Sequence, residues 1–174
     1  MPLQPGKGRG ALRTLAFLAA FLLAACGSSR APTGGGADGV SGLWSCVPYA
    51  RERSGIALRG DAWTWWEAAA GRYERGRAPR EGSVLVLART SRMPQGHVAV
   101  VARVVSAREI RVDHANWASG SAKGRAARNQ PVVDVSPGND WSLVRVWYPR
   151  INGLGASSHP GLGFVHPAAA RAGA

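Results

Sequence analysis

The chain has 174 residues, enough for one domain with a hydrophobic core, and 22 Lys and Arg against 10 Asp and Glu give it a formal charge of +12. A basic balance suits an anionic partner such as nucleic acid, a membrane surface or an acidic cell-wall polymer. The sequence has no basic amphipathic helix, RNA-binding signature or zinc-finger spacing, so we expect no nucleic-acid partner.

The first 25 residues are typical of a targeting signal. A basic stretch precedes a short apolar run, residues 15–23, which is too short to cross a membrane. The run ends in Leu-Ala-Ala-Cys-Gly, residues 23–27, which resembles the cleavage site of bacterial lipoproteins. This resemblance implies that residues 1–25 are removed and that Cys26 is lipidated. An ordinary secretory signal that contains a cysteine is the alternative.

The residues after the signal predict where the protein resides. Gly27 occupies the position where Asp would resemble a signal for retention in the inner membrane. We therefore expect a protein that is lipid-anchored to the outer membrane of a Gram-negative bacterium and faces the periplasm. Residues 26–42 are rich in Gly, Ser, Pro and Ala and lack an apolar period, which predicts a flexible tether.

A helix is predicted to begin at Cys46. Ser45 suits the N-cap, Pro48 suits the first turn and Gly55 is a natural stop. A thiolate at a helix N-terminus is stabilised by the helix dipole and by free N–H groups, so the position predicts a lowered pKa and a nucleophile. A buried structural cysteine is the alternative. A second helix is predicted over residues 60–71, with Asp61 as its N-cap, and this segment carries three tryptophans.

Strands follow the helices, and two of them predict a pair of facing histidines. Residues 82–87, 131–135 and 142–148 are short, mainly apolar runs, and residues 97–104 and 109–114 alternate in a way that favours a β-hairpin. In such a hairpin His97 lies near His114 and Asn116, where a polar neighbour can orient an imidazole. Asp113 is expected to point to the opposite face.

These elements predict an α+β domain over residues 43–150, with the N-terminal helices packed on an antiparallel sheet of about five strands. Residues 151–174 are rich in Gly, Ser, Pro and Ala, so we expect a disordered tail in which His159 and His166 are solvated.

Two other uses of Cys46 are weaker predictions. Zinc binding with His97 and His114 lacks a closely spaced ligand pair, and a disulfide with Cys26 competes with the lipidation signal. We expect no metal and no cofactor.

Five segments in order are similar to the CHAP domain, the cysteine, histidine-dependent amidohydrolase/peptidase family, which is related to NlpC/P60 and papain-like folds. They are Cys-Val-Pro-Tyr-Ala-Arg, Gly-Asp-Ala-Trp, Pro-x-x-Gly-Ser-Val-Leu-Val, Gly-His-Val-Ala-Val-Val and Asn-Trp, at residues 46–51, 60–63, 79–86, 96–101 and 116–117. The resemblance extends over about residues 44–148.

The resemblance implies roles for these residues. Cys46 resembles the nucleophile, and His97 resembles the base that takes its proton. The third residue is His114 or, second, Asn116, and the family often has an acid where this chain has His114. Many members also carry Gln where this chain has Ser45, before the nucleophile. Within the matched segments we expect contacts with substrate from Tyr49, Asp61, Trp63 and Trp117.

The implied activity is that of a peptidoglycan amidase or endopeptidase that acts through a thioester acyl-enzyme. We expect the protein to act as a monomer on peptidoglycan. One alternative is a catalytically silent, peptidoglycan-binding or regulatory lipoprotein with the same fold, which the replacements at Ser45 and His114 would suit. Another is a thiol-dependent amidase that acts on a small molecule.

Overall fold

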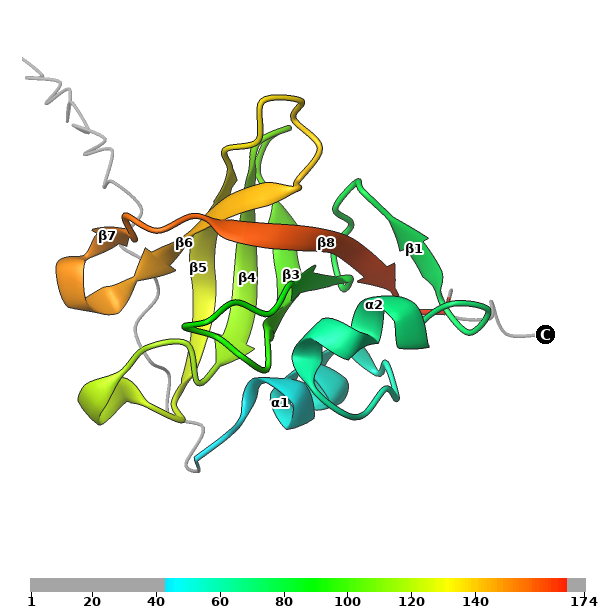
Figure 1. Cartoon of the computed structure of the whole chain (residues 1–174), viewed down its shortest axis with the longest axis horizontal. Helices are drawn as coiled ribbons and strands as arrows, with labels where there is room; N and C mark the ends of the chain where they lie inside the picture. The colour runs from blue at the N-terminus through cyan, green and yellow to red at the C-terminus, as the bar shows by residue number, and fades with distance from the viewer. Residues whose placement is uncertain (1–42, 169–174) are drawn as a thin grey trace, which may run out of the picture. The chain divides into compact units, whose positions relative to one another are not determined.

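The structure is a computed structural model that describes residues 43–168. The predicted signal, the lipidated Cys26, the tether and the last six residues lie outside the described residues. Within the described part, three short helical segments precede the first of eight strands, and two more lie between strands (Figure 1). The helical segments are α1 (Cys46–Ser54), η1 (Ala62–Thr64), α2 (Trp65–Ala68), η2 (Gly120–Ala122) and η3 (Pro149–Ile151). The strands are β1 (Glu74–Gly76), β2 (Val84–Leu87), β3 (His97–Val104), β4 (Glu109–Ala115), β5 (Ala126–Asp134), β6 (Leu143–Tyr148), β7 (Gly153–Leu154) and β8 (His159–His166).

The strands form a closed antiparallel barrel. Their order is β1-β8-β2-β3-β4-β5-β6-β7, and an additional pairing of β8 with β6 joins the two ends of the six-stranded set β8-β2-β3-β4-β5-β6. β1 and β7 lie outside this ring, against β8 and β6. Closure removes the free edges of these six strands and leaves only short edge strands exposed.

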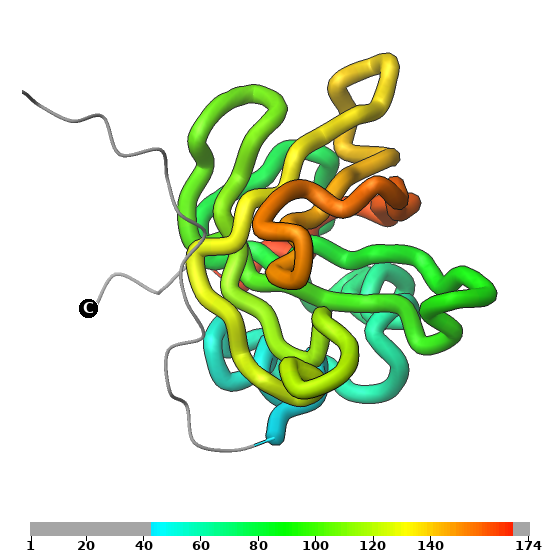
Figure 2. The backbone as a smooth tube through the Cα atoms, turned by 90° about the vertical axis from the view of Figure 1, so that its left-hand side faces the viewer, coloured from blue at the N-terminus to red at the C-terminus, as the bar shows by residue number. Residues whose placement is uncertain are grey.

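The barrel corrects part of the predicted fold. The antiparallel arrangement is confirmed, but the domain is mostly β and its sheet is closed, rather than an open sheet of about five strands under helices. The segment that closes the ring, residues 159–166, is the one that we expected to be a disordered tail. Figures 1 and 2 show this orange and red segment lying against the green and yellow strands rather than extending away from them.

The first helix begins and ends where the sequence predicts. Gly55 adopts φ +72° and its N–H donates to the carbonyl of Arg51, which terminates α1. Ser45 has the extended backbone of an N-cap, but its exposed side chain makes no capping hydrogen bond. The second helix is shorter than predicted, because the chain forms the single turn η1 and then the four residues of α2.

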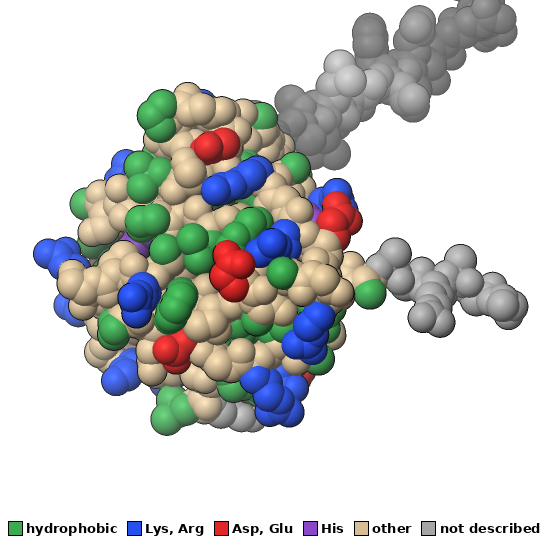
Figure 3. All heavy atoms as spheres, turned by 45° about the vertical axis from the view of Figure 1, so that its right-hand side comes forward, with side chains coloured by type: hydrophobic (Ala, Val, Ile, Leu, Met, Phe, Trp, Pro, Cys, Tyr) green, Lys and Arg blue, Asp and Glu red, His purple; other side chains and the backbone are tan. Residues whose placement is uncertain are grey.

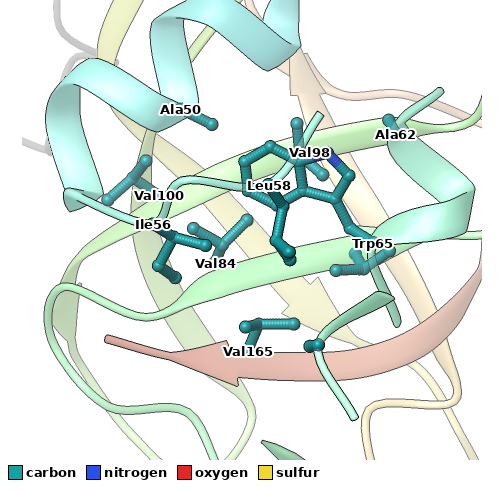
Figure 4. Close-up of a cluster of buried hydrophobic side chains, with 11 residues drawn as sticks. Ala50, Ile56, Leu58, Ala62, Trp65, Val84, Val98, Val100 and Val165 are labelled. Atoms are coloured by element: carbon teal, nitrogen blue, oxygen red, sulfur yellow. The ribbon is translucent and has the colours of Figure 1, made fainter. Parts of the chain in front are cut away.

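Two apolar clusters share the strands between them. One fills the barrel interior and contains residues from all six barrel strands, among them Leu85, Ala99, Val112 and Phe164. The other lies between the helices and the outer face of β2, β3 and β8, with Trp65 at its centre (Figure 4). Because successive strand residues face opposite sides, β2, β3 and β8 each contribute to both clusters, which fixes the side on which α1 must pack.

The described surface is mixed in charge on the face that Figure 3 draws. Basic side chains are dispersed there among acidic, polar and apolar ones, and the described residues of that face form no single basic patch. Within residues 43–168, no helix is long and apolar enough to cross a membrane.

Candidate active site

Cys46 is the first residue of α1 and carries a free thiol. The side chain is half-buried and packs against the cluster between the helices and the barrel. The backbone N–H groups of Cys46, Val47 and Val98 interact with the sulfur. Since Val98 follows His97 directly on β3, the thiol lies beside the start of the strand that carries the imidazole.

Burial changes the expected state of this thiol. Desolvation raises the pKa of Cys46 above 9.0, and the hydrogen bonds from the backbone of Val98 and Val47, which favour the thiolate, offset only part of this effect. The prediction of a lowered thiol pKa is therefore wrong for the free protein. A helix N-terminus stabilises a thiolate, but loss of solvent outweighs that contribution here.

A glycine is required where the chain turns into β3. Gly96 has φ +68°, and a Cβ atom there would lie 2.7 Å from the carbonyl oxygen of Leu87 and 2.8 Å from the backbone nitrogen of Trp63. The N–H of Trp63 also donates to the carbonyl of Gln95. This close approach holds η1 against the loop and fixes the direction in which β3 begins with His97.

The hairpin brings His97 and His114 into direct contact, as predicted. Nε2 of His97 lies 3.2 Å from Nδ1 of His114, and the two rings meet edge to face with centroids 5.2 Å apart. Both side chains are buried. His97 lies two residues from Ala99 on β3, and His114 lies two residues from Val112 on β4. Because alternate strand residues face the same side and Ala99 and Val112 belong to the interior cluster, both imidazoles lie at one end of the barrel interior.

Burial keeps both imidazoles neutral. Desolvation lowers the pKa of His114 to about 4. The pKa of His97 is lowered well below 6.5, first by desolvation and then by the charges that His114 and His159 would carry. At neutral pH the site therefore holds a neutral thiol beside a neutral imidazole that is hydrogen-bonded to a second one.

The structure separates the candidates for the third residue by their partners. Asn116 has φ +59°, and its side-chain oxygen accepts a hydrogen bond from the N–H of Gly124, so its carboxamide organises the loop after β4. Asp113 points to the opposite face from His114, as predicted, and there forms an ion pair of 3.0 Å with Arg53 of α1. Of the two candidates, His114 is the one whose side chain contacts His97.

Trp117 joins the imidazoles into one aromatic cluster. Its ring centroid lies 4.8 Å from that of His97 and 5.7 Å from that of His114, and its indole N–H donates to the carbonyl of Trp147. His159, at the start of β8, meets the same indole with centroids 5.0 Å apart. The predicted contact of Trp117 with substrate stays a prediction, whereas the prediction that His159 is solvated is wrong.

The sequence carried a weak signal for β8. Leu162 and Phe164 alternate with glycine and valine, as in a short strand, but the surrounding Gly, Pro and Ser residues masked it. His166, at the other end of the strand, is also buried rather than solvated.

The remaining predicted contact residues lie in different environments. Tyr49 is only 2% exposed and packs with Ala115 and Ala126, so it supports α1 instead of facing a ligand. Trp63 is half-buried under the guanidinium of Arg89, whose Cζ lies 4.8 Å from the ring centroid. Asp61 is exposed, and its carbonyl accepts a hydrogen bond from the hydroxyl of Thr64. In the part of the chain that the structure describes, no three His, Cys, Asp or Glu side chains converge in a way that could hold a metal ion.

Comparison with known proteins identifies the first part of the domain. Residues 36–116 match the family model of the CHAP domain. The match contains Cys46, His97, His114 and Asn116, and it ends before Trp117, whereas the sequence resemblance extended to about residue 148. No curated protein matches the chain.

Proposed function

From the premise that the chain contains a CHAP domain, we propose that it hydrolyses an amide bond of peptidoglycan with Cys46 as its nucleophile. CHAP domains have activity of the peptidoglycan-hydrolase type and are generally amidases or peptidases. One observation carries the assignment of residues. His97 Nε2 lies 3.2 Å from His114 Nδ1, and the N–H of Val98, the residue that follows His97 on the same strand, interacts with the Cys46 thiol.

The contact between the imidazoles defines a route for the proton. When His97 carries its proton on Nε2 and donates it to His114 Nδ1, its own Nδ1 bears a lone pair. That nitrogen takes the thiol proton as the Cys46 sulfur attacks the amide carbonyl, and the resulting imidazolium protonates the leaving amine. Water then attacks the thioester with His97 as the base, which releases the carboxylate and restores the thiol.

The neutral resting state determines how the nucleophile is activated. Because burial raises the pKa of Cys46 and lowers that of His97, a thiolate–imidazolium pair is disfavoured before substrate binds. Proton transfer is therefore coupled to the attack on the carbonyl. His114, with a pKa of about 4, stays neutral and holds the tautomer of His97 that this transfer requires.

The backbone supports the developing negative charge. The N–H of Cys46 belongs to the unpaired first turn of α1, where the helix dipole also favours an anion. Ser45 is exposed and makes no capping hydrogen bond, so its hydroxyl is free to turn toward an oxyanion but is not held there.

The lipoprotein signal supports a location close to this substrate. A Cys26-linked anchor at the outer membrane, followed by the tether, would hold the domain in the periplasm within reach of the cell wall. Replacement of Cys26 by Ala is expected to move the protein from the membrane fraction to the soluble fraction. Retention of the Cys26→Ala protein in the membrane fraction would contradict the anchor.

A digest tests the proposed activity. The full-length, reduced protein is incubated with purified Gram-negative peptidoglycan beside Cys46→Ala, and the released fragments are analysed by mass spectrometry. Free stem peptides from the parent alone would identify a muramoyl amidase. Shortened peptides still attached to sugar would identify an endopeptidase. Cleavage by Cys46→Ala would contradict the assigned nucleophile.

The buried thiol also favours a second candidate, a peptidoglycan-binding protein that does not cleave. Its sulfur is protonated at neutral pH, and the Gln found before the nucleophile in many family members is replaced by Ser45. This candidate predicts that parent and Cys46→Ala proteins co-sediment equally with peptidoglycan and that neither releases fragments.

A further inference from the structure

A cavity of about 660 Å³ opens beside the imidazole cluster. The segment after the family match builds nearly all of it: of its lining residues, Arg92 alone precedes residue 117. The other walls come from the loop after β4, from β6 and from the segment that leads through η3 and β7 into β8. Its size is in the range of cavities that hold small molecules, and it exceeds what a single amino-acid side chain fills.

Two aromatic residues connect this cavity to the proposed catalytic residues. Trp117 lines the cavity and lies 4.8 Å from His97 between ring centroids. His159 also lines it and contacts the ring of Trp117, with centroids 5.0 Å apart. A group bound in the cavity therefore lies close to the imidazole of His97, the proposed acceptor of the thiol proton.

The chemistry of the walls indicates what the cavity binds. Trp117 and Tyr148 offer flat ring surfaces, and Ile151, which is 59% exposed, extends the apolar wall toward solvent. Hydroxyl groups lie among these surfaces: Ser119 Oγ and Tyr148 Oη are 2.8 Å apart. Rings beside hydroxyl groups match a molecule that is apolar on its faces and carries hydroxyl or amide groups at its rim.

We propose that this cavity binds the N-acetylated amino-sugar rings of the peptidoglycan chain. The inference rests on the proposed function, because it places one part of that substrate in the same site. The C–H faces of a pyranose ring fit against Trp117 and Tyr148, and its hydroxyl and acetamido groups can bond with the hydroxyls of Ser119 and Ser157 and with Arg92.

Charge argues against the stem peptide as the occupant. A stem peptide carries several carboxylates and free amines. Among the described residues that line the cavity, Arg92 is the one cation of fixed charge, and no Asp or Glu is present. His159 adds no charge at neutral pH because burial lowers its pKa. The uncharged sugar rings thus leave fewer ionic groups unpaired than a peptide would.

The position of the cavity also predicts the bond that is cut. A sugar held against Trp117, whose ring contacts His97, brings the adjoining amide, between the lactyl group of muramic acid and the first residue of the peptide, toward the Cys46 sulfur. The geometry thus favours amidase over endopeptidase activity.

Binding measurements with two adjacent serines test this inference. Ser157 lines the cavity and Ser158 does not, and both are exposed, so the same large side chain can be introduced at either without disturbing the core. The full-length Cys46→Ala protein, which cannot turn substrate over, is titrated calorimetrically with the peptide-free disaccharide, whose lactyl carboxyl is capped as an amide as in the substrate, and with the free stem peptide. The same titrations follow with Ser157→Trp and Ser158→Trp added.

We expect the disaccharide to bind at least tenfold more tightly than the free peptide. We expect Ser157→Trp to weaken disaccharide binding at least tenfold and Ser158→Trp to change it less than twofold. Absence of disaccharide binding would overturn the inference. So would equal effects of the two serine variants, or an effect of Ser157→Trp on peptide binding alone.

The digest and the titration fail in different ways. If the parent releases fragments from peptidoglycan while the disaccharide does not bind, the sugar assignment is wrong and the hydrolase stands. If the disaccharide binds in a manner sensitive to Ser157→Trp while no fragment is released, the sugar assignment stands and the hydrolase is wrong.

Discussion

The two halves of the described domain contribute different things to the candidate site. Residues 43–116 lie within the family match and supply the thiol, the two facing imidazoles and the glycine that directs β3. Residues 117–168 supply Trp117, His159, nearly all of the cavity wall and the strand that closes the barrel. The reacting groups thus come from elements early in the chain. The surface that would select a substrate depends on a later segment, which folds back against those elements.

Replacement of one buried histidine in each half should show the largest difference in cleavage between the two halves. His97→Gln removes the proposed base, and we expect cleavage to fall about 10³-fold, equivalent to about 4 kcal/mol. His166→Gln removes a histidine that is equally buried in β8 but belongs to no part of the site, so it is the matched control. Fragment release from peptidoglycan measures both. An equal loss in the two variants would mean that His97 acts through stability alone.

A core substitution in the C-terminal segment tests its structural role. Phe164 is fully buried in the barrel interior, where its ring meets Trp141 edge to face with centroids 5.6 Å apart. Phe164→Ala should lower the free energy of unfolding by about 3 kcal/mol or more, because it leaves a cavity that the barrel cannot close. Urea denaturation measures the change. A loss below about 1 kcal/mol would indicate that β8 contributes little to the core.

The buried imidazoles predict how stability depends on pH. The pKa of His114 is about 4 in the folded protein against 6.5 for the free side chain, so between these values the unfolded chain binds more protons. The free energy of unfolding should therefore decrease as pH falls, by about 2 kcal/mol between pH 7 and pH 5 from His114 alone. The lowered pKa of His97 acts in the same direction.

Urea denaturation at the two pH values measures this effect, with His114→Gln as the comparison. The variant lacks the titrating group, so its stability should change less between pH 7 and pH 5 than that of the parent. If both proteins lose the same stability, His114 is not the buried neutral group that the structure describes.

The smallest expected effect distinguishes the two candidates for the third residue. Asn116→Ala removes the hydrogen bond to the Gly124 N–H and replaces a residue that tolerates positive φ, so we expect a loss of about 1 kcal/mol in stability. Cleavage should decrease less than tenfold, and Asn116→Asp, which keeps an acceptor oxygen, should restore stability. A larger loss of cleavage in Asn116→Ala than in His114→Ala would make Asn116 the orienting residue.

The sequence predicted the local elements well because their signals are local. The helix that begins at Cys46 follows from its terminating glycine, and the hairpin that joins His97 to His114 follows from alternation and strand length. The contact between these histidines needs only antiparallel pairing of adjacent strands, so it was predictable without tertiary information.

Tertiary structure decided the rest. The state of the Cys46 thiol depends on how much solvent the barrel and helices exclude, which a helix position does not reveal. The last strand reads as a tail because it contains glycines, yet Gly163 has φ +131° and an added Cβ would lie 2.6 Å from the ring of Trp66. Gly163 is needed for close packing of β8, a requirement set by a residue about a hundred positions away. Local composition could therefore predict neither the closed barrel nor the place of His159 and the cavity beside the histidines.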